Sequence, residues 1–218
     1  MPTMLNIFKK QILSKDEEKQ NIPKAFIFLG RSGCGKGTQA KLLIDKLCKV
    51  GGKSCKTLHV ESGTLIREFS KGDSYTQKHT KSVMDQGLLV PEAVIVSLWM
   101  NNLEKNFTGS ENLVFDGTPR KLREAQLLDD TLKFYKIEKP TVICTNVSRD
   151  WSEKRLLGRA RKDDNPESIN KRLGWYDTEV VPVINFYKSN SYYKVLDING
   201  EQPIEDVHKE ILTKLGMN

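Results

Sequence analysis

Short apolar runs alternate with longer amphipathic segments along most of the chain. The runs are rich in β-branched and aromatic residues and predict strands near residues 25–29, 56–60, 112–115, 141–146 and 193–197. The segments between them carry the spacing of helices. Because strands that alternate with helices are joined by crossover connections, this pattern predicts an α/β fold with a parallel sheet and helices on both of its faces.

Two stretches depart from the simple alternation. Residues 1–23 form an N-terminal appendage, in which Leu5, Phe8 and Ile12 share one helical face before a charged stretch that ends at Pro23. Residues from about 61 to 97 hold several short helices between the second and third strands, which is more than a crossover needs. We therefore expect one main domain over residues 24–218 with a small helical, substrate-binding insertion.

Length and composition restrict the class of protein. A chain of 218 residues is long enough for one α/β domain with a full core. No apolar run approaches the roughly 18 residues of a membrane span. The first residues lack the apolar core of a secretory signal, and Asp16, Glu17 and Glu18 depart from the acid-poor composition of a transit peptide. We expect a cytoplasmic protein that associates with no membrane.

The cysteines and the net charge exclude further classes. Cys34, Cys48, Cys55 and Cys144 form no C-x-x-C pair, so neither a disulfide framework nor a structural zinc site is expected. The net charge of +7 raises the alternative of a nucleic-acid-binding protein, but the lysines are spread along the chain without a block of like charges. We expect no nucleic acid as a partner. Most arginines, in contrast, stand beside motifs, and arginine suits bidentate contacts with phosphate.

The glycine-rich segment Gly30–Gln39 follows the first apolar run directly and is typical of a phosphate-binding loop. Its glycines let successive backbone N–H groups turn toward one anion, and the helix that follows presents its positive end to the same place. Lys36 adds a mobile positive charge for terminal phosphates. A strict P-loop pattern places Ser or Thr directly after the lysine as a magnesium ligand, whereas this chain has Gly37 followed by Thr38.

A Gly-x-x-Gly-x-Gly-Lys-Gly-Thr-Gln loop resembles that of the nucleoside monophosphate kinases, and of the adenylate kinases above all. The resemblance runs from about residue 24 to the C-terminus. It implies a P-loop NTPase-type sheet, ATP as phosphoryl donor, a nucleoside monophosphate as acceptor, and Mg²⁺ held mostly through water. It assigns residues 61–97 to acceptor binding and residues 159–166 to a very short lid.

The third strand ends in Asp116-Gly117-Thr118-Pro119-Arg120, which is similar to the Asp-Gly-Phe-Pro-Arg signature of the family, with Thr118 in place of phenylalanine. The resemblance implies that Asp116 holds the metal through water and that Arg120 binds the acceptor phosphate.

Ser62-Gly63-Thr64, followed by Arg67, is similar to the acceptor segment of the family, although Thr64 stands where aspartate is usual. Ser62 is then expected to contact the acceptor nucleotide and Arg67 its phosphate. The segment Met84–Pro91 resembles the loop beneath the acceptor base.

The segment from Arg155 to Pro166 is similar to the family's lid. The resemblance implies that Arg159 and Arg161 contact phosphates, that Arg172 joins them, and that Arg155 lies against the donor adenine. Only three residues separate Arg159 from Asp163, so closure is expected to be that of a flap rather than a domain. Asn199–Pro203 resembles the loop that recognises the donor adenine through its backbone.

Glu124 makes the acceptor base an open question. Four residues after Arg120, the adenylate kinases usually carry a glutamine that pairs with adenine, and an ionised glutamate accepts hydrogen bonds only. It would face the N1 lone pair of adenine unpaired, whereas guanine offers donors at N1 and N2. Two alternatives remain: Glu124 turns to solvent or pairs with Arg123 while backbone groups select adenine, or the acceptor is GMP or a pyrimidine nucleotide.

The sequence thus predicts phosphoryl transfer from ATP to AMP that gives two ADP, with another acceptor (GMP, CMP or UMP) or a non-transferring nucleotide-binding protein as alternatives. We expect a monomer. The residues expected to supply positive charge to the reaction are Lys36, Arg120, Arg159, Arg161 and Arg172. Those expected to bind ATP are Gly33, Cys34, Gly35, Lys36, Gly37, Thr38, Arg155, Arg159 and Gln202. Those expected to bind the acceptor are Ser62, Arg67, Gly87, Val90, Asp116, Gly117, Arg120, Glu124, Arg161 and Arg172.

Overall fold

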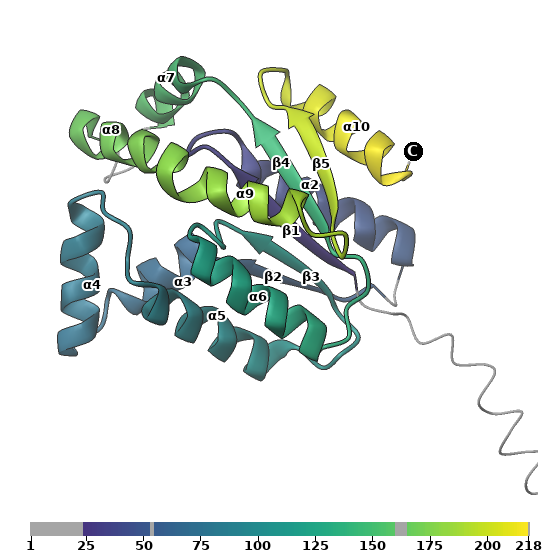
Figure 1. The fold of residues 1–218 in the computed structure, drawn as a ribbon, viewed down its shortest axis with the longest axis horizontal. Helices are drawn as coiled ribbons and strands as arrows, with labels where there is room; N and C mark the ends of the chain where they lie inside the picture. The colour runs from purple at the N-terminus through teal and green to yellow at the C-terminus, as the bar shows by residue number, and fades with distance from the viewer. Residues whose placement is uncertain (1–23, 53–54, 160–164, 218) are drawn as a thin grey trace, which may run out of the picture.

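A five-stranded parallel sheet forms the centre of the fold (Figure 1). The structure is a computed structural model that describes residues 24–52, 55–159 and 165–217. The predicted appendage 1–23, Arg161 and most of the predicted lid lie outside the described residues. In chain order the strands are β1 (Ala25–Gly30), β2 (Thr57–Glu61), β3 (Asn112–Asp116), β4 (Thr141–Asn146) and β5 (Lys194–Asn199). The predicted strands and the α/β class are confirmed, with strand ends that differ by at most two residues.

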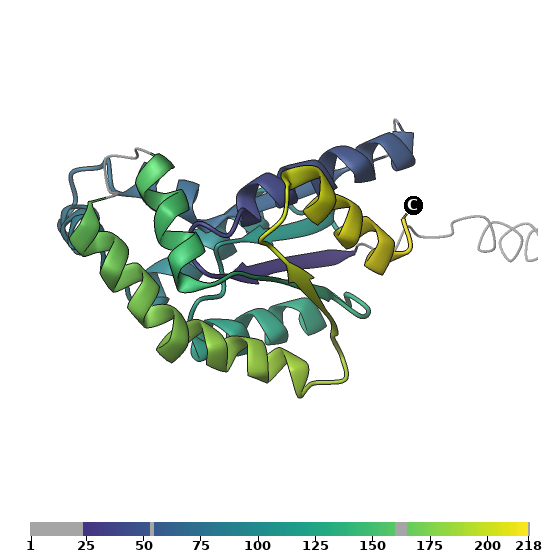
Figure 2. The same cartoon turned by 90° about the horizontal axis from the view of Figure 1, so that it is seen from above.

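Helices cover both faces of the sheet, as Figure 2 shows with the strands seen on edge. One face packs against α2 (Lys36–Gly51) and α10 (Ile204–Leu215), and the other against α5 (Glu92–Asn106), α6 (Leu122–Phe134) and α9 (Val181–Lys188). Side chains of a strand alternate between faces, so in β1 Phe26 and Phe28 belong to the first core and Ile27 and Leu29 to the second. This double burial explains why the strands read as continuous apolar runs.

The connection between β2 and β3 contains α3 (Ser62–Phe69), α4 (Tyr75–Asp85) and α5. Helix α4 begins at a capping box, in which the Ser74 hydroxyl accepts from the Gln77 N–H at 3.3 Å and the Gln77 side chain accepts from the Ser74 N–H at 3.0 Å. The predicted short helices of this connection are therefore present, and they place Arg67 and Gly87 beside the sheet's edge.

Within the described residues, four helical segments lie between β4 and β5. Helices α7 (Arg149–Arg159) and α8 (Pro166–Trp175) share a small core of Leu156, Ile169 and Leu173. Between α8 and α9 lies a π-helical turn, η2 (Tyr176–Val180). Pro182 explains this turn, since a proline lacks an N–H and its ring clashes with the carbonyl four residues before it, here Thr178. A widened turn relieves that clash without ending the helix.

The sheet order is β2-β3-β1-β4-β5, so β1 lies between β3 and β4. The chain leaves β1 toward β2 on one side of the sheet and leaves the neighbouring β4 toward β5 on the other side. Ligands of open parallel sheets bind in the crevice at such a switch point, beyond the strands' carboxyl ends. Gly30, Asp116 and Glu61 all lie at that edge, because β1, β3 and β2 end there in register. The sheet therefore brings the sequence motifs together.

Candidate active site

The loop that follows β1 begins in close contact with the backbone of β4. Gly30 has φ +148°, and a Cβ there would lie 2.5 Å from the Thr145 carbonyl oxygen. Only glycine therefore fits between β1 and β4 at this position. The Lys36 ammonium donates to the carbonyl oxygens of Gly30 at 2.8 Å and Arg31 at 3.0 Å. The loop thus holds its lysine at the start of α2, at the place where phosphates are expected.

Asp116 ends β3 beside this loop and is only 7% exposed. Burial raises the pKa of its carboxyl group, and the positive charges of Lys36, His59 and Arg120 oppose that rise. A Cβ at Gly37 would lie 3.0 Å from Asp116 Oδ2. The bare backbone of Gly37 therefore leaves room at the carboxylate where a strict P-loop carries a hydroxyl side chain.

These surroundings fit a magnesium ion held largely through water. Mg²⁺ prefers oxygen ligands, keeps several waters and binds proteins through one or two carboxylates together with substrate phosphates. Asp116 and the Thr38 hydroxyl supply oxygen atoms at the cleft. Within the described residues no group of three or more His, Cys, Asp or Glu side chains is placed to enclose a metal. The donor set is thus of the sparse kind that leaves coordination sites to water and phosphate.

Three arginines line the same cleft: Arg67 from α3, Arg120 from the loop between β3 and α6, and Arg172 from α8. Burial lowers the pKa of Arg120, the nearby charges of Arg172 and Arg67 lower it further, and Glu124 and Asp116 oppose the shift. Arg120 Nε donates to the Gly117 carbonyl at 2.8 Å. Because like charges so arranged repel one another, an anion bound among them is stabilised.

Arg67 is held by the residue that departs from the family pattern. Its guanidinium donates to the Thr64 hydroxyl at 3.0 Å and lies 3.4 Å from Glu61 Oε1. A threonine at this position therefore still orients the arginine, although it lacks the carboxylate that the family usually has there.

Glu124 lies in the first turn of α6 and is 3% exposed. Its Oε2 accepts from the Arg120 backbone N–H at 2.8 Å and from the Thr118 hydroxyl at 3.3 Å. Burial raises the pKa of this carboxyl group, and the bond from the Arg120 N–H opposes that rise. The expectation that Glu124 turns to solvent is wrong, because its oxygen satisfies a free N–H just before a helix start.

One cleft of about 830 Å³ joins these groups. The predicted residues that line it are Gly33, Gly35, Lys36, Gly37, Thr38, Arg67, Gly87, Val90, Asp116, Gly117, Arg120, Glu124, Arg155, Arg159 and Arg172. Cys34 and Ser62 are buried behind the lining, and the Ser62 hydroxyl donates to the Asp116 carbonyl at 3.4 Å. The motifs that were far apart in the sequence therefore form a single site.

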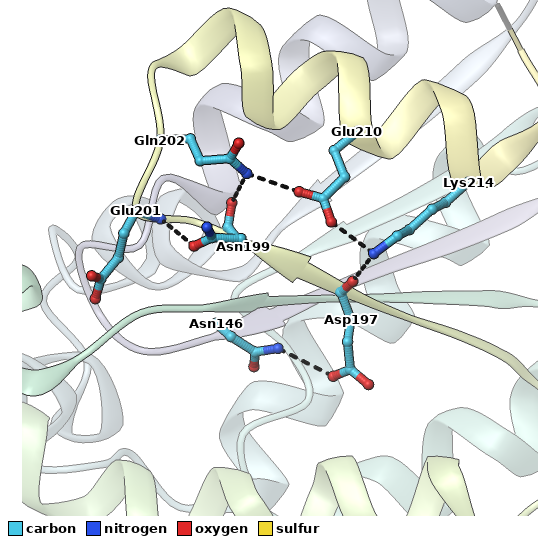
Figure 3. A network of polar contacts seen from close by, with 7 residues as sticks. All are labelled: Asn146, Asp197, Asn199, Glu201, Gln202, Glu210 and Lys214. Atoms are coloured by element: carbon cyan, nitrogen blue, oxygen red, sulfur yellow. Dashed lines mark hydrogen bonds and ion pairs between the residues drawn. The ribbon is translucent and has the colours of Figure 1, made fainter.

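Gln202 belongs to a separate polar network, shown in Figure 3. Its amide donates to the Asn199 carbonyl and to Glu210 Oε2, both at 2.9 Å, and Lys214 in turn donates to Glu210 at 2.7 Å. These bonds give the loop between β5 and α10 its shape. The side chain is not among those that line the cleft in the described part of the chain, and its expected role toward the donor adenine stays a prediction.

Sequence reasoning missed two residues near the site. Trp175 lines the cleft, lies 5.7 Å from the Arg120 guanidinium and donates from Nε1 to the Gly87 carbonyl at 3.3 Å. Its position three residues after Arg172, on the same helical face, was the available signal. Arg31 follows Gly30 in the phosphate loop, and its partners lie more than 140 residues away. No local pattern indicates such a contact.

Two further expectations concern cysteines and membranes. All four cysteines are free. Cys55 donates to Cys48 Sγ at 3.0 Å, and the spacing of the two residues in the sequence did not indicate this contact.

Among the helices that the structure describes, none has the length and apolar content needed to cross a membrane.

Comparison with known proteins gives the same family throughout. The family model described as adenylate kinase matches residues 28–192. The adenylate kinase of Leptospira biflexa is 33% identical over 196 residues, which cover 88% of this chain and 100% of the relative. Adenylate kinase 1 of Nostoc sp. (strain PCC 7120) is 34% identical over 190 residues, which cover 87% and 97%. An adenylate kinase of Prochlorococcus marinus is 36% identical over 187 residues, which cover 85% and 94%. With the loop, the Asp116 segment and the arginines in one cleft, the chain belongs to the adenylate kinase family.

Proposed function

We propose that this protein catalyses reversible, Mg²⁺-dependent transfer of a phosphoryl group from ATP to AMP, giving two ADP. One observation carries the proposal: a single cleft is lined both by Lys36 with its phosphate loop and by a second positive group, Arg67, Arg120 and Arg172. One set of positive groups suits the donor phosphates and the second suits the phosphate of an acceptor. The names of the similar proteins point to the same reaction.

The proposed chemistry needs no nucleophilic side chain. The acceptor phosphate is already ionised near neutral pH, so its oxygen attacks the γ-phosphorus of ATP in line, and the protein contributes positioning and charge neutralisation. Bound Mg²⁺ supplies further charge to the donor phosphates, with Asp116 and Thr38 as the residues that would hold its waters. Lys36, Arg120, Arg159 and Arg172 line the cleft from which equatorial oxygens would be neutralised.

The parts of the fold divide the task. In this proposal residues 61–97 bind the acceptor and residues 159–166 act as a short flap that excludes water from the transferring group. The Arg155 guanidinium lies 4.8 Å from the centroid of the Trp151 ring. A guanidinium is a flat, positively charged group of the kind that stacks on a purine. A monomer in the cytoplasm, without nucleic acid, remains our expectation.

The surplus of arginines argues against a nucleotide-binding protein that transfers nothing. Such a protein needs the phosphate loop and Asp116 but has no second phosphate for Arg67, Arg120 and Arg172 to hold. A coupled assay of the full chain with ATP and Mg²⁺ tests the proposal against AMP, GMP, CMP and UMP. We expect ADP formation with AMP that stops on addition of a magnesium chelator. The absence of transfer to all four acceptors would overturn the proposal.

Replacing Glu124 by glutamine is expected to raise the ratio of kcat/KM for AMP to kcat/KM for GMP by roughly 10-fold or more. The amide oxygen can keep the bonds from the Arg120 N–H and Thr118, so the change places an N–H₂ donor where Oε1 lies now. A donor can pair with adenine N1, whereas a carboxylate cannot.

Steady-state kinetics with both acceptors measure this ratio. Glu138→Gln is a matched control, because Glu138 is an exposed glutamate beyond the far end of α6 and is not among the residues that line the cleft in the described part of the chain. Its ratio should equal that of the wild type. An unchanged ratio in Glu124→Gln would show that Glu124 does not read the base.

A further inference from the structure

The side chain of Arg31 extends from the phosphate loop and contacts the helical segment formed by α8 and η2. Its guanidinium forms a fork with Asp177, with Nη2 3.0 Å from Oδ1 and Nη1 3.3 Å from Oδ2. Nη1 also donates to the Leu173 carbonyl at 3.3 Å, and the side chain is 13% exposed. Arg31 thus joins the donor loop to the end of α8 and the beginning of η2.

An aromatic ring completes the contact. The Arg31 guanidinium lies 4.1 Å from the centroid of the Tyr176 ring, and burial raises the pKa of Tyr176 to about 12, so the ring remains a neutral phenol. A guanidinium can stack on a ring with its face while it donates from its edge to a carboxylate. The ammonium of a lysine is a point charge and cannot make both contacts in this geometry.

The helix held in this way carries two groups of the site. Arg172 directly precedes Leu173, and Trp175 directly precedes Tyr176, and both line the cleft. Trp175 also binds the Gly87 carbonyl of the acceptor loop. Gly30 and Ser32 line the cleft on either side of Arg31, whereas Arg31 itself is not among the residues that line it in the described part of the chain. Its side chain therefore acts behind the site.

We propose that Arg31 is a positioning residue, which fixes the donor phosphate loop against the helix that carries Arg172. The phosphate loop and Arg172 are then held in a fixed position relative to each other when both contact the transferring phosphoryl group. The inference rests on the proposed kinase function. A misplacement of about 1 Å between groups that act together in a transition state costs up to about 100-fold in rate. Each nucleotide alone still finds its own binding groups, so the loss falls on kcat.

Arg31→Ala is expected to lower kcat by about 10- to 100-fold, with KM for ATP and for AMP changed by less than about 3-fold. Arg31→Lys keeps the charge but loses the fork and the stacking, so it should restore only a small part of the rate. Asp177→Asn should lower kcat in the same direction by a smaller factor. The double variant should be no slower than Arg31→Ala, because both changes remove one contact.

Arg149→Ala is the matched control. Arg149 donates to Asn170 Oδ1 at 2.6 Å, so it is another arginine that contacts α8, at a distance in sequence from the phosphate loop. Its kcat should stay within about 2-fold of the wild type, the range expected of a change away from the chemistry. A kcat loss in Arg149→Ala equal to that in Arg31→Ala would show that any weakening of α8 suffices and would overturn the inference.

Amide hydrogen exchange on the full chain separates this inference from the proposed function, since it needs no activity. Arg31→Ala should speed exchange both in the loop from Gly30 to Lys36 and in η2, whereas Arg149→Ala should leave the loop unchanged. Wild-type exchange in both segments of Arg31→Ala would overturn the inference, as would wild-type kcat or a loss confined to KM for ATP. An inactive wild type with the expected exchange pattern would instead overturn the proposed function.

Discussion

Replacing Lys36 by methionine is expected to lower turnover by about 10²- to 10³-fold or more in a protein that still folds. One preorganised positive charge on a transferring phosphoryl group contributes an effect of this size. Methionine keeps an unbranched side chain of similar length and loses the ammonium, which here is directed by the carbonyl oxygens of Gly30 and Arg31 toward the loop's centre. The fold should persist, because the core of α2 is made by Ala40, Leu43 and Leu47.

Initial rates at saturating ATP and AMP measure the effect, and circular dichroism checks the fold. Lys49→Met is the matched control, since it is the same substitution on an exposed residue in the last turn of α2. Its turnover should equal that of the wild type. Near-normal turnover in Lys36→Met would remove Lys36 from the proposed mechanism.

Arg120→Ala is expected to reduce turnover by about 10²- to 10³-fold, while the affinity for ATP in the absence of acceptor stays nearly unchanged. Arg120 lies within electrostatic reach of Arg172 and Arg67, so its loss removes positive charge from the group of arginines proposed to hold the acceptor phosphate. The Glu124 carboxylate keeps its bond from the backbone N–H at position 120, which alanine retains. The start of α6 should therefore remain intact.

Calorimetric titration with ATP alone measures the affinity for the donor, and steady-state kinetics with AMP measure the loss of turnover. Arg123→Ala removes a neighbouring exposed arginine from α6 and should leave both measurements unchanged. If ATP binding collapses in Arg120→Ala, the residue acts on the donor side and the proposed division of the cleft is wrong.

Much of the fold follows from local pattern. The strands are buried on both faces, so β1, β3 and β4 are nearly uninterrupted apolar runs, and periodicity alone identifies them. The glycines of the phosphate loop are needed for backbone reasons that sequence also displays, as at Gly30, where the Thr145 carbonyl excludes a Cβ. Because the carboxyl ends of parallel strands share one edge, the motifs after β1, β2 and β3 had to converge.

The hydrogen-bond partners of polar side chains could not be predicted from the sequence in the same way. Glu124 was expected at the acceptor base or in solvent. The structure rules out solvent by burying Glu124 against the Arg120 N–H and the Thr118 hydroxyl, and its role at the acceptor base stays a prediction. The bonds that the Gln202 amide donates to Asn199 and Glu210 could not be read from the sequence either, and its expected role at the donor site stays a prediction. A polar side chain takes whichever buried donor or acceptor lies within reach, and that choice depends on the packed surroundings.

The sequence by itself determined the class of fold and the family, because apolar periodicity and glycine-rich turns are local properties of the chain. It also identified Lys36, Arg120, Arg159 and Arg172, which line one cleft in the described part of the chain. Only the tertiary structure decided how the two halves of the cleft are joined. Arg31 contacts Asp177 across 146 residues, and Trp175 contacts Gly87 across 88. Such bonds arise from the packing of α8 and η2 beside the loops, and the free energy of a fork or a stacked ring depends on distances that exist only in the folded chain.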